Sequence, residues 1–421
     1  MSDTFTTVAG IYTLTWEQEA LVIRIDRLSE DSRHNVSGEI LIRSGGRHVH
    51  QARMNLTSTR SRDDVVKQCD KRAADVDWTS FIEEAAVSVL EQFRAGEPMI
   101  DMATYVPSSG NKYKMYPLLL EGQANLLYGL GGSGKSYLAT LIAAKVSKGY
   151  QDEYGEIHPP ERVLYLDYET GADEIYSRLS SIQMGLGLEP TPEILYHSSS
   201  QSLIVEIEQI QRTVAEEDVR LVIVDSVAYA CGGEAETSQP ATNYSNALRS
   251  LHTTTLSIGH VSKDVRASTP YGSVFWFNGA RSIWEVVRSQ DTGTNMLNIG
   301  LIHRKVNNGS LAMPLGYQVS FENDCVYFKE QEISMVPEAE EKLPLRERIE
   351  HLLASEGDLP VADIAQMLER AEGTIRKTLH RSSQFKVSKN GAQPAHWALA
   401  SQADLSEPVS DGMEVAQFAD V

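Results

Sequence analysis

The stretch Gly129-Leu130-Gly131-Gly132-Ser133-Gly134-Lys135-Ser136 decides how the middle of this chain folds. It matches the G-x-x-x-x-G-K-[ST] pattern of a phosphate-binding P-loop at every fixed position. Residues 124–128 before it, apolar except for Asn125, predict a buried strand, and residues 137–146 after it predict a helix. In that setting the backbone N–H groups of the turn and of the helix N-terminus point at phosphate oxygens. The sequence therefore predicts a nucleoside triphosphate site.

The residues of the loop have separate expected roles. Lys135 is expected to reach the β- and γ-phosphates, and the Ser136 hydroxyl is expected to bind Mg²⁺. The remaining expected nucleotide contacts are Gly129, Gly131, Gly132, Ser133, Gly134 and Tyr137. A glycine-rich turn that binds nothing is the alternative, and the strand and the helix that flank the loop argue against it.

The bulk composition limits the classes of function. The chain has 421 residues and a net charge of −20, which disfavours a protein coated with nucleic acid but allows local basic sites. No apolar run approaches the roughly 18 to 20 residues that a membrane span needs, and the N-terminus lacks a signal-peptide pattern. Three scattered cysteines show no zinc-site spacing and indicate reduced thiols. We therefore expect a cytoplasmic protein that does not act at a membrane.

Periodicity divides the chain into segments. The first is a small α+β domain over residues 1–105, with strands near 20–27, 37–43 and 48–56 and a helix over 78–93. Residues 118–332 alternate strands with helices, which predicts a doubly wound α/β domain with a parallel-rich sheet. A proline-containing linker is expected on either side of this domain, the second over 330–344.

The C-terminal part has a different pattern. Within residues 343–400, three short predicted helices precede two predicted strands, the element order of a winged helix. Residues 401–421 contain five acidic residues and no lysine or arginine, which predicts a disordered tail.

Carboxylates follow two predicted core strands, where ligands of open α/β sheets bind. Asp225 closes the strand 221–225 and is expected to support Mg²⁺, although an aspartate there can also cap the next turn. Glu169 is expected to polarise the attacking water. Its alternative, shared with Asp167, is to cap the helix 173–181. His260 ends a third strand and is expected to sense the γ-phosphate, unless it is a plain structural histidine.

These motifs together resemble a known family. The P-loop, YLDYE at 165–169, LVIVDS at 221–226 and GHVSK at 259–263 are similar to the RecA-like ATPases. Within that group the chain is most similar to plasmid RepA-type and DnaB-like hexameric replicative helicases. Residues 272–281 resemble the family's glycine- and serine-rich hairpin with its following arginine, and 305–309 resemble its K-x-N-x-G segment.

The resemblance implies ATP and Mg²⁺ as ligands and a homo-oligomer, a hexameric ring with ATP between subunits. By position Arg281 is then the arginine finger supplied to a neighbour, and Lys305 is a second basic contact. Tyr271 and Asn307 stand where relatives usually carry basic residues, so Arg288 and Arg304 are rival fingers. Alternatively, Arg281 packs its stem on Trp284 or joins a surface ion pair.

The predicted winged helix supplies expected DNA contacts. Six basic residues and one acidic residue lie between Arg370 and Asn390, inside a strongly acidic chain. The expected duplex contacts are Arg376, Lys377, Arg381, Lys386 and Lys389. Residues 265–276 are a candidate loop for a single strand. A winged helix used for protein contact, and an ordinary surface hairpin over 265–276, remain alternatives.

Two functions remain open from the sequence. The first is an oligomeric ATPase that acts on DNA, resembling a replicative helicase of a plasmid, phage or mobile element. The second is an ATP-dependent DNA-binding regulator without unwinding activity. A kinase that phosphorylates a small molecule has less support, because the chain lacks an arginine-rich lid.

Overall fold

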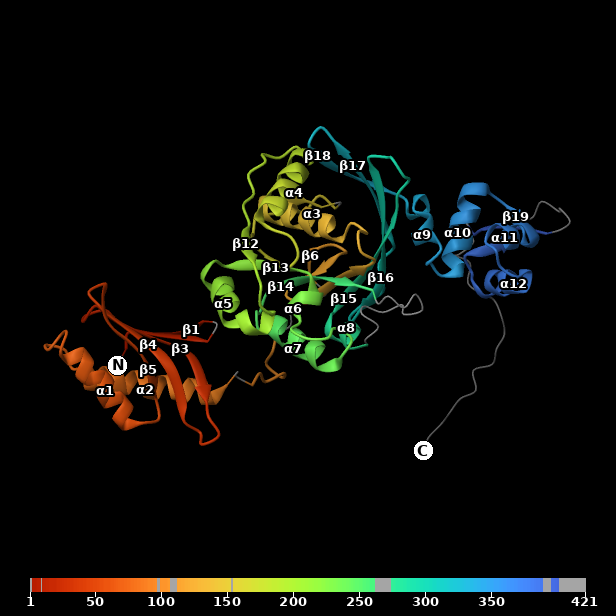
Figure 1. The fold of residues 1–421 in the computed structure, drawn as a ribbon. Helices are drawn as coiled ribbons and strands as arrows, with labels where there is room; N and C mark the ends of the chain where they lie inside the picture. Colours follow the sequence, from red (N-terminus) through yellow and green to blue (C-terminus); the bar gives the residue numbers. More distant parts are fainter. Residues whose placement is uncertain are drawn as a thin grey trace, which may run out of the picture. The chain divides into compact units, whose positions relative to one another are not determined.

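The computed structural model describes residues 2–8, 10–96, 99–106, 112–152, 154–261, 274–388 and 395–400. Figure 1 shows these residues coloured along the chain. Two compact units are present, and their boundary falls inside β15 after Val286 and inside β16 before His303. Over the described ranges, no helix combines the length and apolar character that crossing a bilayer requires.

The N-terminal segment is an antiparallel sheet with two helices. Its strands pair in sequence order: β1 (Thr4–Val8), β2 (Ile11–Trp16), β3 (Leu21–Glu30), β4 (Val36–Ser44) and β5 (Arg47–Asn55). The helices are α1 (Thr59–Asp70) and α2 (Trp78–Ala95). Alternate residues such as Ile23 and Ile40 are buried and share one apolar core with Trp78 of α2. The expected strands and the second helix are present, whereas β1, β2 and α1 were not predicted.

The core has the expected α/β fold, arranged around one large sheet. The sheet order is β12-β11-β13-β14-β8-β15-β16-β17-β18. The first six strands of that order are β12 (Leu195–Ser198), β11 (Arg162–Asp167), β13 (Val219–Asp225), β14 (Thr254–His260), β8 (Ala124–Gly129) and β15 (Ser282–Ser289). Neighbouring strands among these six pair in parallel, as a doubly wound domain requires. The last three are β16 (Met296–Val306), β17 (Leu315–Glu322) and β18 (Cys325–Gln331), and β16 pairs antiparallel with β17.

Helices cover both faces of the parallel strands. In Figure 1, α3 (Lys135–Lys148) and α4 (Ala172–Gly185) lie together on one face. On the other face lie α5 (Leu203–Glu216), α6 (Val227–Ala230) and α7 (Ser238–Arg249), where Ile210 and Tyr244 pack against Val224 of the sheet. Two small ribbons, β6 (Tyr113–Met115) with β7 (Leu119–Leu120) and β9 (Tyr150–Gln151) with β10 (Ile157–His158), complete this region.

One expected hairpin is partly a helix. Residues 262–273 lie outside the described residues, but α8 covers Val274–Gly279, within the segment expected to be a hairpin. Trp276 of α8 is buried, and its Nε1 donates a hydrogen bond of 2.6 Å to the carbonyl of Ala235. Trp276 therefore anchors this segment to the core, and residues 274–279 form a helix where a hairpin was expected.

The expected linker 330–344 is also structured. It contains η1 (Ile333–Met335) and α9 (Pro337–Glu340); Val336 between them and Ala339 of α9 are fully buried. They pack in one cluster with Ile302, and a Cβ at Gly300 would lie 2.4 Å from the Cβ of Ala339. The acidic and proline-containing composition concealed this spacing of apolar residues.

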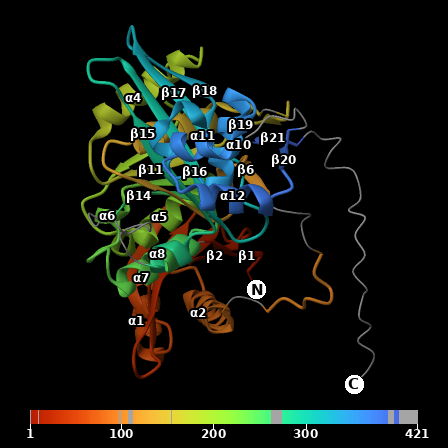
Figure 2. The same cartoon turned by 90° about the vertical axis from the view of Figure 1, so that its right-hand side faces the viewer.

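The C-terminal elements form one small core. They are α10 (Leu345–Glu356), β19 (Leu359–Pro360), α11 (Val361–Met367), α12 (Glu372–Arg381), β20 (Phe385–Val387) and β21 (His396–Leu399). Figure 2 shows the three helices gathered around the short sheet, whose strand order is β19-β21-β20. Ile349, Ile364 and Ile375, one from each helix, are fully buried together with Trp397. The expected acidic tail and the turn at Asn390-Gly391 lie outside the described residues.

Candidate active site

The P-loop joins β8 to α3 at the carboxyl edge of the sheet. Gly132 and Gly134 have φ values of 72° and 88°, a left-handed conformation that glycine adopts without strain. Gly129 is required for a different reason, because a Cβ there would lie 2.2 Å from the carbonyl oxygen of Val286. The glycines of the motif thus fit both the turn and the tight packing of β8 against β15.

The ammonium of Lys135 is folded onto its own loop. Its Nζ donates hydrogen bonds of 3.0 Å to the carbonyl of Gly129 and 2.7 Å to that of Leu130. Burial lowers the pKa of Lys135 to about 8, and the charges of Asp225 and Glu169 oppose that shift. A buried cation with neutral partners is well placed to exchange them for phosphate oxygens.

Asp225 lies at the end of β13 and is almost fully buried. Its Oδ2 accepts a hydrogen bond of 2.8 Å from the phenol of Tyr165, and the carboxylate is also hydrogen-bonded to the side chain of Ser136. Burial raises the pKa of Asp225, and these two hydrogen bonds oppose the rise. Ser136 and Asp225, the two residues expected to support Mg²⁺, are therefore in contact, and their oxygens suit this hard cation.

Glu169 lies at the centre of a polar group. Its Oε1 accepts a hydrogen bond from the Ser226 hydroxyl and lies 3.4 Å from Nε2 of His260. The hydrogen bond from His260 is the largest contribution to a lowered pKa of Glu169, whereas burial acts in the opposite direction. Glu169 is thus held ionised, as an acceptor for the proton of a water would be.

Asp167 has a structural role in presenting Glu169. One carboxylate oxygen accepts the backbone N–H groups of Glu169, at 3.0 Å, and Thr170, at 3.1 Å. The other accepts the Tyr196 phenol at 2.9 Å. Helix α4 begins at Ala172 with Gly171 as its N-cap and has no side-chain cap, so neither carboxylate caps this helix. Asp167 therefore builds the turn, which leaves Glu169 for the polar group.

The expected basic contacts lie at the opposite edge of the sheet. In the parallel pairing of β15 with β8, Ser282 is opposite Asn125 and Val286 is opposite Gly129. Arg281 precedes Ser282 and is exposed, so it lies roughly 15 Å from Gly129 along the strand direction. The charge of Arg281 contributes, after burial, to a lowered pKa of Lys305, so these two cations are neighbours.

Lys305 and Arg304 have partners within the chain. The Nζ of Lys305 donates to the carbonyls of Phe277, at 2.6 Å, and Ala280, at 2.8 Å, beside the C-terminus of α8. Arg304 contacts Oε2 of the buried Glu285 through Nε at 2.8 Å and Nη2 at 2.7 Å. Arg288, the other rival finger, lies near the carboxyl end of β15. Arg281 is exposed and can reach a neighbouring molecule, whereas Arg304 would have to leave its ion pair with Glu285 to do so.

Sequence reasoning missed three residues of this region. Ser226 and Tyr165 contact the two carboxylates, and Arg178 on α4 places its guanidinium 4.8 Å from the ring centroid of Tyr137. Ser226 directly follows Asp225, so its position in LVIVDS was an available signal. Tyr165 reads as one more apolar strand residue, and the sequence does not reveal which partner its hydroxyl faces.

The expected DNA contacts lie in the C-terminal elements. Arg376, Lys377 and Arg381 are exposed on α12, whose Ile375 and Leu379 are fully buried. Arg376 lies 3.8 Å from Glu372 one turn earlier, and Lys386 lies on β20. Lys389, the fifth expected contact, lies outside the described residues.

Comparison with known proteins gives a family match for part of the core. Residues 100–265 match the family model described as an AAA domain, a range that contains the P-loop, Glu169, Asp225 and His260. Over this range the chain is similar to the AAA domain family, and the geometry of its P-loop fits nucleotide binding. No curated protein gives a significant match. Among solved structures, a KaiC-like protein of the archaeon Pyrococcus horikoshii is 17% identical, covering 50% of this chain and 91% of its own, with a TM-score of 0.37.

Proposed function

We propose that this chain is an oligomeric ATPase that couples ATP hydrolysis to work on DNA, in the manner of a hexameric replicative helicase. Arg281 supports the oligomeric part most directly. It lies at the amino edge of the parallel strands, whereas Lys135, Asp225 and Glu169 lie at or beyond the carboxyl edge. An arginine side chain cannot cover that separation, so Arg281 would act on the ATP of a neighbouring subunit.

The proposed chemistry uses the polar group around Glu169. Lys135 binds the β- and γ-phosphates of ATP, and Ser136 with Asp225 supports Mg²⁺, which neutralises developing charge. Glu169 orients the attacking water, because Ser226 and His260 fix its Oε1 and leave its second oxygen outside these contacts. Loss of the γ-phosphate would alter the contact of His260 with Glu169, and His260 connects to the chain that follows β14.

The DNA part of the proposal rests on the C-terminal elements. Their helix and strand order is the one that winged helices use, and α12 occupies the position of a recognition helix. Its exposed face carries Arg376, Lys377 and Arg381 in a chain whose overall charge is −20. Concentrating positive charge on one short helix of an acidic protein favours local attraction to phosphates.

The oligomeric claim is tested by mixing variants. Arg281→Ala should bind ATP but not hydrolyse it, and Lys135→Ala should do neither. Mixing the two should restore part of the ATPase activity through interfaces that combine an intact P-loop with an intact arginine. Arg220→Ala, an exposed arginine near the amino end of β13, is the matched control and should hydrolyse ATP normally. Absence of recovery on mixing would contradict a finger supplied between subunits.

The DNA claim is tested by ATPase rates with and without single- and double-stranded DNA. The double variant Arg376→Ala/Lys377→Ala should lose the stimulation of its ATPase rate by DNA. The control Arg60→Ala/Lys67→Ala, which removes the same charge from exposed positions of α1, should keep it. An ATPase rate that is unchanged by both single- and double-stranded DNA would overturn the proposal. Duplex binding with slow hydrolysis and no strand displacement would instead indicate the ATP-dependent regulator.

A further inference from the structure

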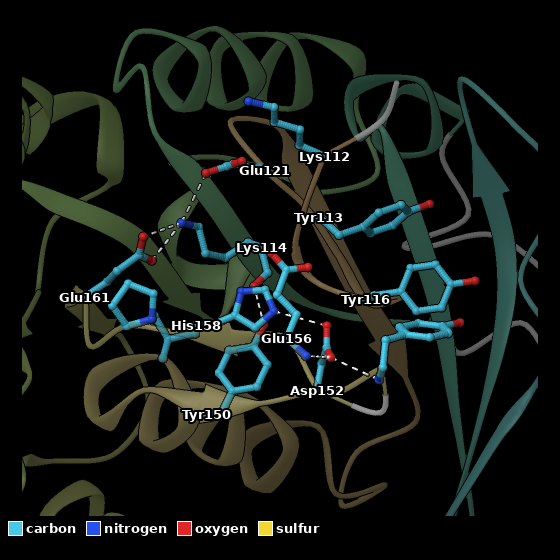
Figure 3. A pocket seen from close by; sticks show the side chains of 13 residues that line it. Lys112, Tyr113, Lys114, Tyr116, Glu121, Tyr150, Asp152, Glu156, His158 and Glu161 are labelled. Atoms are coloured by element: carbon cyan, nitrogen blue, oxygen red, sulfur yellow. Dashed lines mark hydrogen bonds and ion pairs between the residues drawn. The ribbon is translucent and has the colours of Figure 1, made fainter. Parts of the chain in front are cut away.

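A second polar pocket lies beyond the C-terminal end of α3. It has a volume of about 520 Å³ and is bordered by β6, the β9–β10 ribbon and the start of β11. Helix α3 begins at Lys135 and has 14 residues, so this pocket lies about 20 Å from the P-loop. Figure 3 shows Asp152, Glu156 and His158 side by side at this pocket. The ATPase chemistry proposed above does not use these three residues.

The turn that carries Asp152 is closed by hydrogen bonds. Oδ1 of Asp152 accepts the backbone N–H groups of Tyr154, at 3.0 Å, and Glu156, at 2.8 Å. The backbone N–H of Asp152 donates to the carbonyl of Glu156 at 3.0 Å. With Oδ1 engaged, Oδ2 faces Nε2 of His158 at 3.2 Å. The carboxylate is therefore oriented before any ligand arrives.

The imidazole of His158 is held from its other side. It stacks on the ring of Tyr150 with centroids 4.5 Å apart and an interplanar angle of 11°. The Tyr150 hydroxyl donates a hydrogen bond of 2.6 Å to the carbonyl of Lys114. This bond holds the tyrosine ring against which the imidazole stacks. Partners of this kind, which orient a ligand residue without binding the ion, are typical of metal sites.

The charges around the pocket favour a cation. Lys114 contacts both oxygens of Glu161 at 2.7 Å and lies 3.3 Å from Glu121, so its charge is already balanced. Asp152 and Glu156 then contribute two negative charges beside His158. Within the described ranges these three residues are also the group whose possible ligand atoms all lie within 4.8 Å of one another.

We infer that Asp152, Glu156 and His158 bind a divalent ion of the Zn²⁺ class. Two atoms that each lie about 2.1 Å from a shared ion are separated by about 3.0 to 3.4 Å, depending on the coordination angle. The 3.2 Å between Asp152 Oδ2 and His158 Nε2 fits this spacing, and a carboxylate oxygen of the exposed Glu156 lies within 4.8 Å of both atoms. One imidazole with two carboxylates suits Zn²⁺ better than Mg²⁺, which prefers oxygen ligands. Three protein ligands leave a coordination position open to the pocket.

The test measures Zn²⁺ binding by the full chain without nucleotide, in competition with a chromophoric chelator. We expect one Zn²⁺ per chain, at least tenfold weaker binding in Glu156→Gln and loss of this ion in His158→Ala, with Mg²⁺ unable to compete. Co²⁺ should show visible absorption bands that disappear in His158→Ala. His34→Ala is the matched control, because His34 also pairs with one carboxylate, Glu30 at 2.9 Å, but has no third ligand beside it.

The outcomes separate the metal site from a structural hydrogen bond. ATP binding at the distant P-loop verifies that each variant is folded. Zn²⁺ should raise the melting temperature of the parent protein and of His34→Ala, but not that of His158→Ala. No stoichiometric Zn²⁺, or the same affinity in the parent and in His158→Ala, would overturn the inference. In that case the contact between Asp152 and His158 would serve the turn alone.

Discussion

The phenol of Tyr165 donates a hydrogen bond of 2.8 Å to Oδ2 of Asp225, from the strand beside the one that Asp225 closes. The side chain of Ser136 is hydrogen-bonded to the same carboxylate. Burial raises the pKa of Asp225, and these two hydrogen bonds lower it. They therefore favour the ionised carboxylate, which is the form that supports Mg²⁺. Tyr165 is thus a positioning residue for the proposed metal-binding pair.

Tyr165→Phe should raise the Mg²⁺ concentration that hydrolysis requires. Removing one hydrogen bond to a charged group costs about 1.5 kcal/mol, so the Mg²⁺ concentration for half-maximal ATPase activity should rise about tenfold. Tyr196→Phe removes a similar phenol contact from Asp167, which builds the neighbouring turn. An equal shift in both variants would mean that Tyr165 acts on the stability of the sheet rather than on Asp225.

His260→Ala should move the acid limb of the pH profile. The hydrogen bond from His260 lowers the pKa of Glu169, so its removal should raise that pKa. Glu169 acts as an acceptor only when ionised, and activity should therefore be lost at a higher pH as the solution is acidified. The dependence of kcat/KM on pH measures the shift. Ser226→Ala should move the limb in the same direction, whereas an unchanged limb in both variants would exclude Glu169 as the titrating group.

Nucleotide binding should take up a proton at alkaline pH. Lys135 has a pKa of about 8 in the free protein because it is buried, and phosphate charges would raise that pKa on binding. At pH 8 about half of the Lys135 side chains are neutral, so Mg²⁺-ATP binding should take up roughly half a proton. Calorimetry in buffers with different ionisation enthalpies measures this uptake, which should vanish near pH 6.5. Equal heats in all buffers at pH 8 would contradict a lowered pKa.

The strands and the site were predictable to different degrees. β11 and β13 are largely apolar runs that end in an aspartate and β14 ends at His260, so Asp225 and His260 could be located from the sequence alone. The partners of these residues depend on the register between β11 and β13, which no local sequence pattern encodes. Asp167 lies opposite Asp225, and the turn after Asp167 brings Glu169 to the hydroxyl of Ser226. The sequence favoured Glu169 but left helix capping open for both Asp167 and Glu169, and their hydrogen bonds show that neither caps α4.

Tertiary packing also overrode local composition. The family resemblance predicted a hairpin over residues 272–281, but residues 274–279 form α8, whose Trp276 is buried. In the acidic segment 330–344, apolar residues at 333, 336 and 339 dock beside Gly300, a contact between residues far apart in the sequence. Such contacts are set by the whole fold.

Gly129→Ala should destabilise the core, and Gly131→Ala should not. Both glycines belong to the P-loop motif, and neither has a positive φ. An added Cβ at Gly129 would lie 2.2 Å from the Val286 carbonyl oxygen, so β8 and β15 would have to separate. At Gly131 nothing lies within 4 Å of an added Cβ.

We expect the free energy of unfolding of Gly129→Ala to fall by about 1 to 3 kcal/mol, the usual cost of overpacking. Gly131→Ala should have the same free energy of unfolding as the parent protein. Any loss of ATP affinity in this variant would then reflect the phosphate contacts alone. Urea denaturation of the two variants beside the parent protein measures the difference. If Gly129→Ala also had the free energy of unfolding of the parent protein, Gly129 would be required for the approach of phosphate rather than for the packing of two strands. The pair therefore separates the structural from the ligand-binding requirement within a single motif.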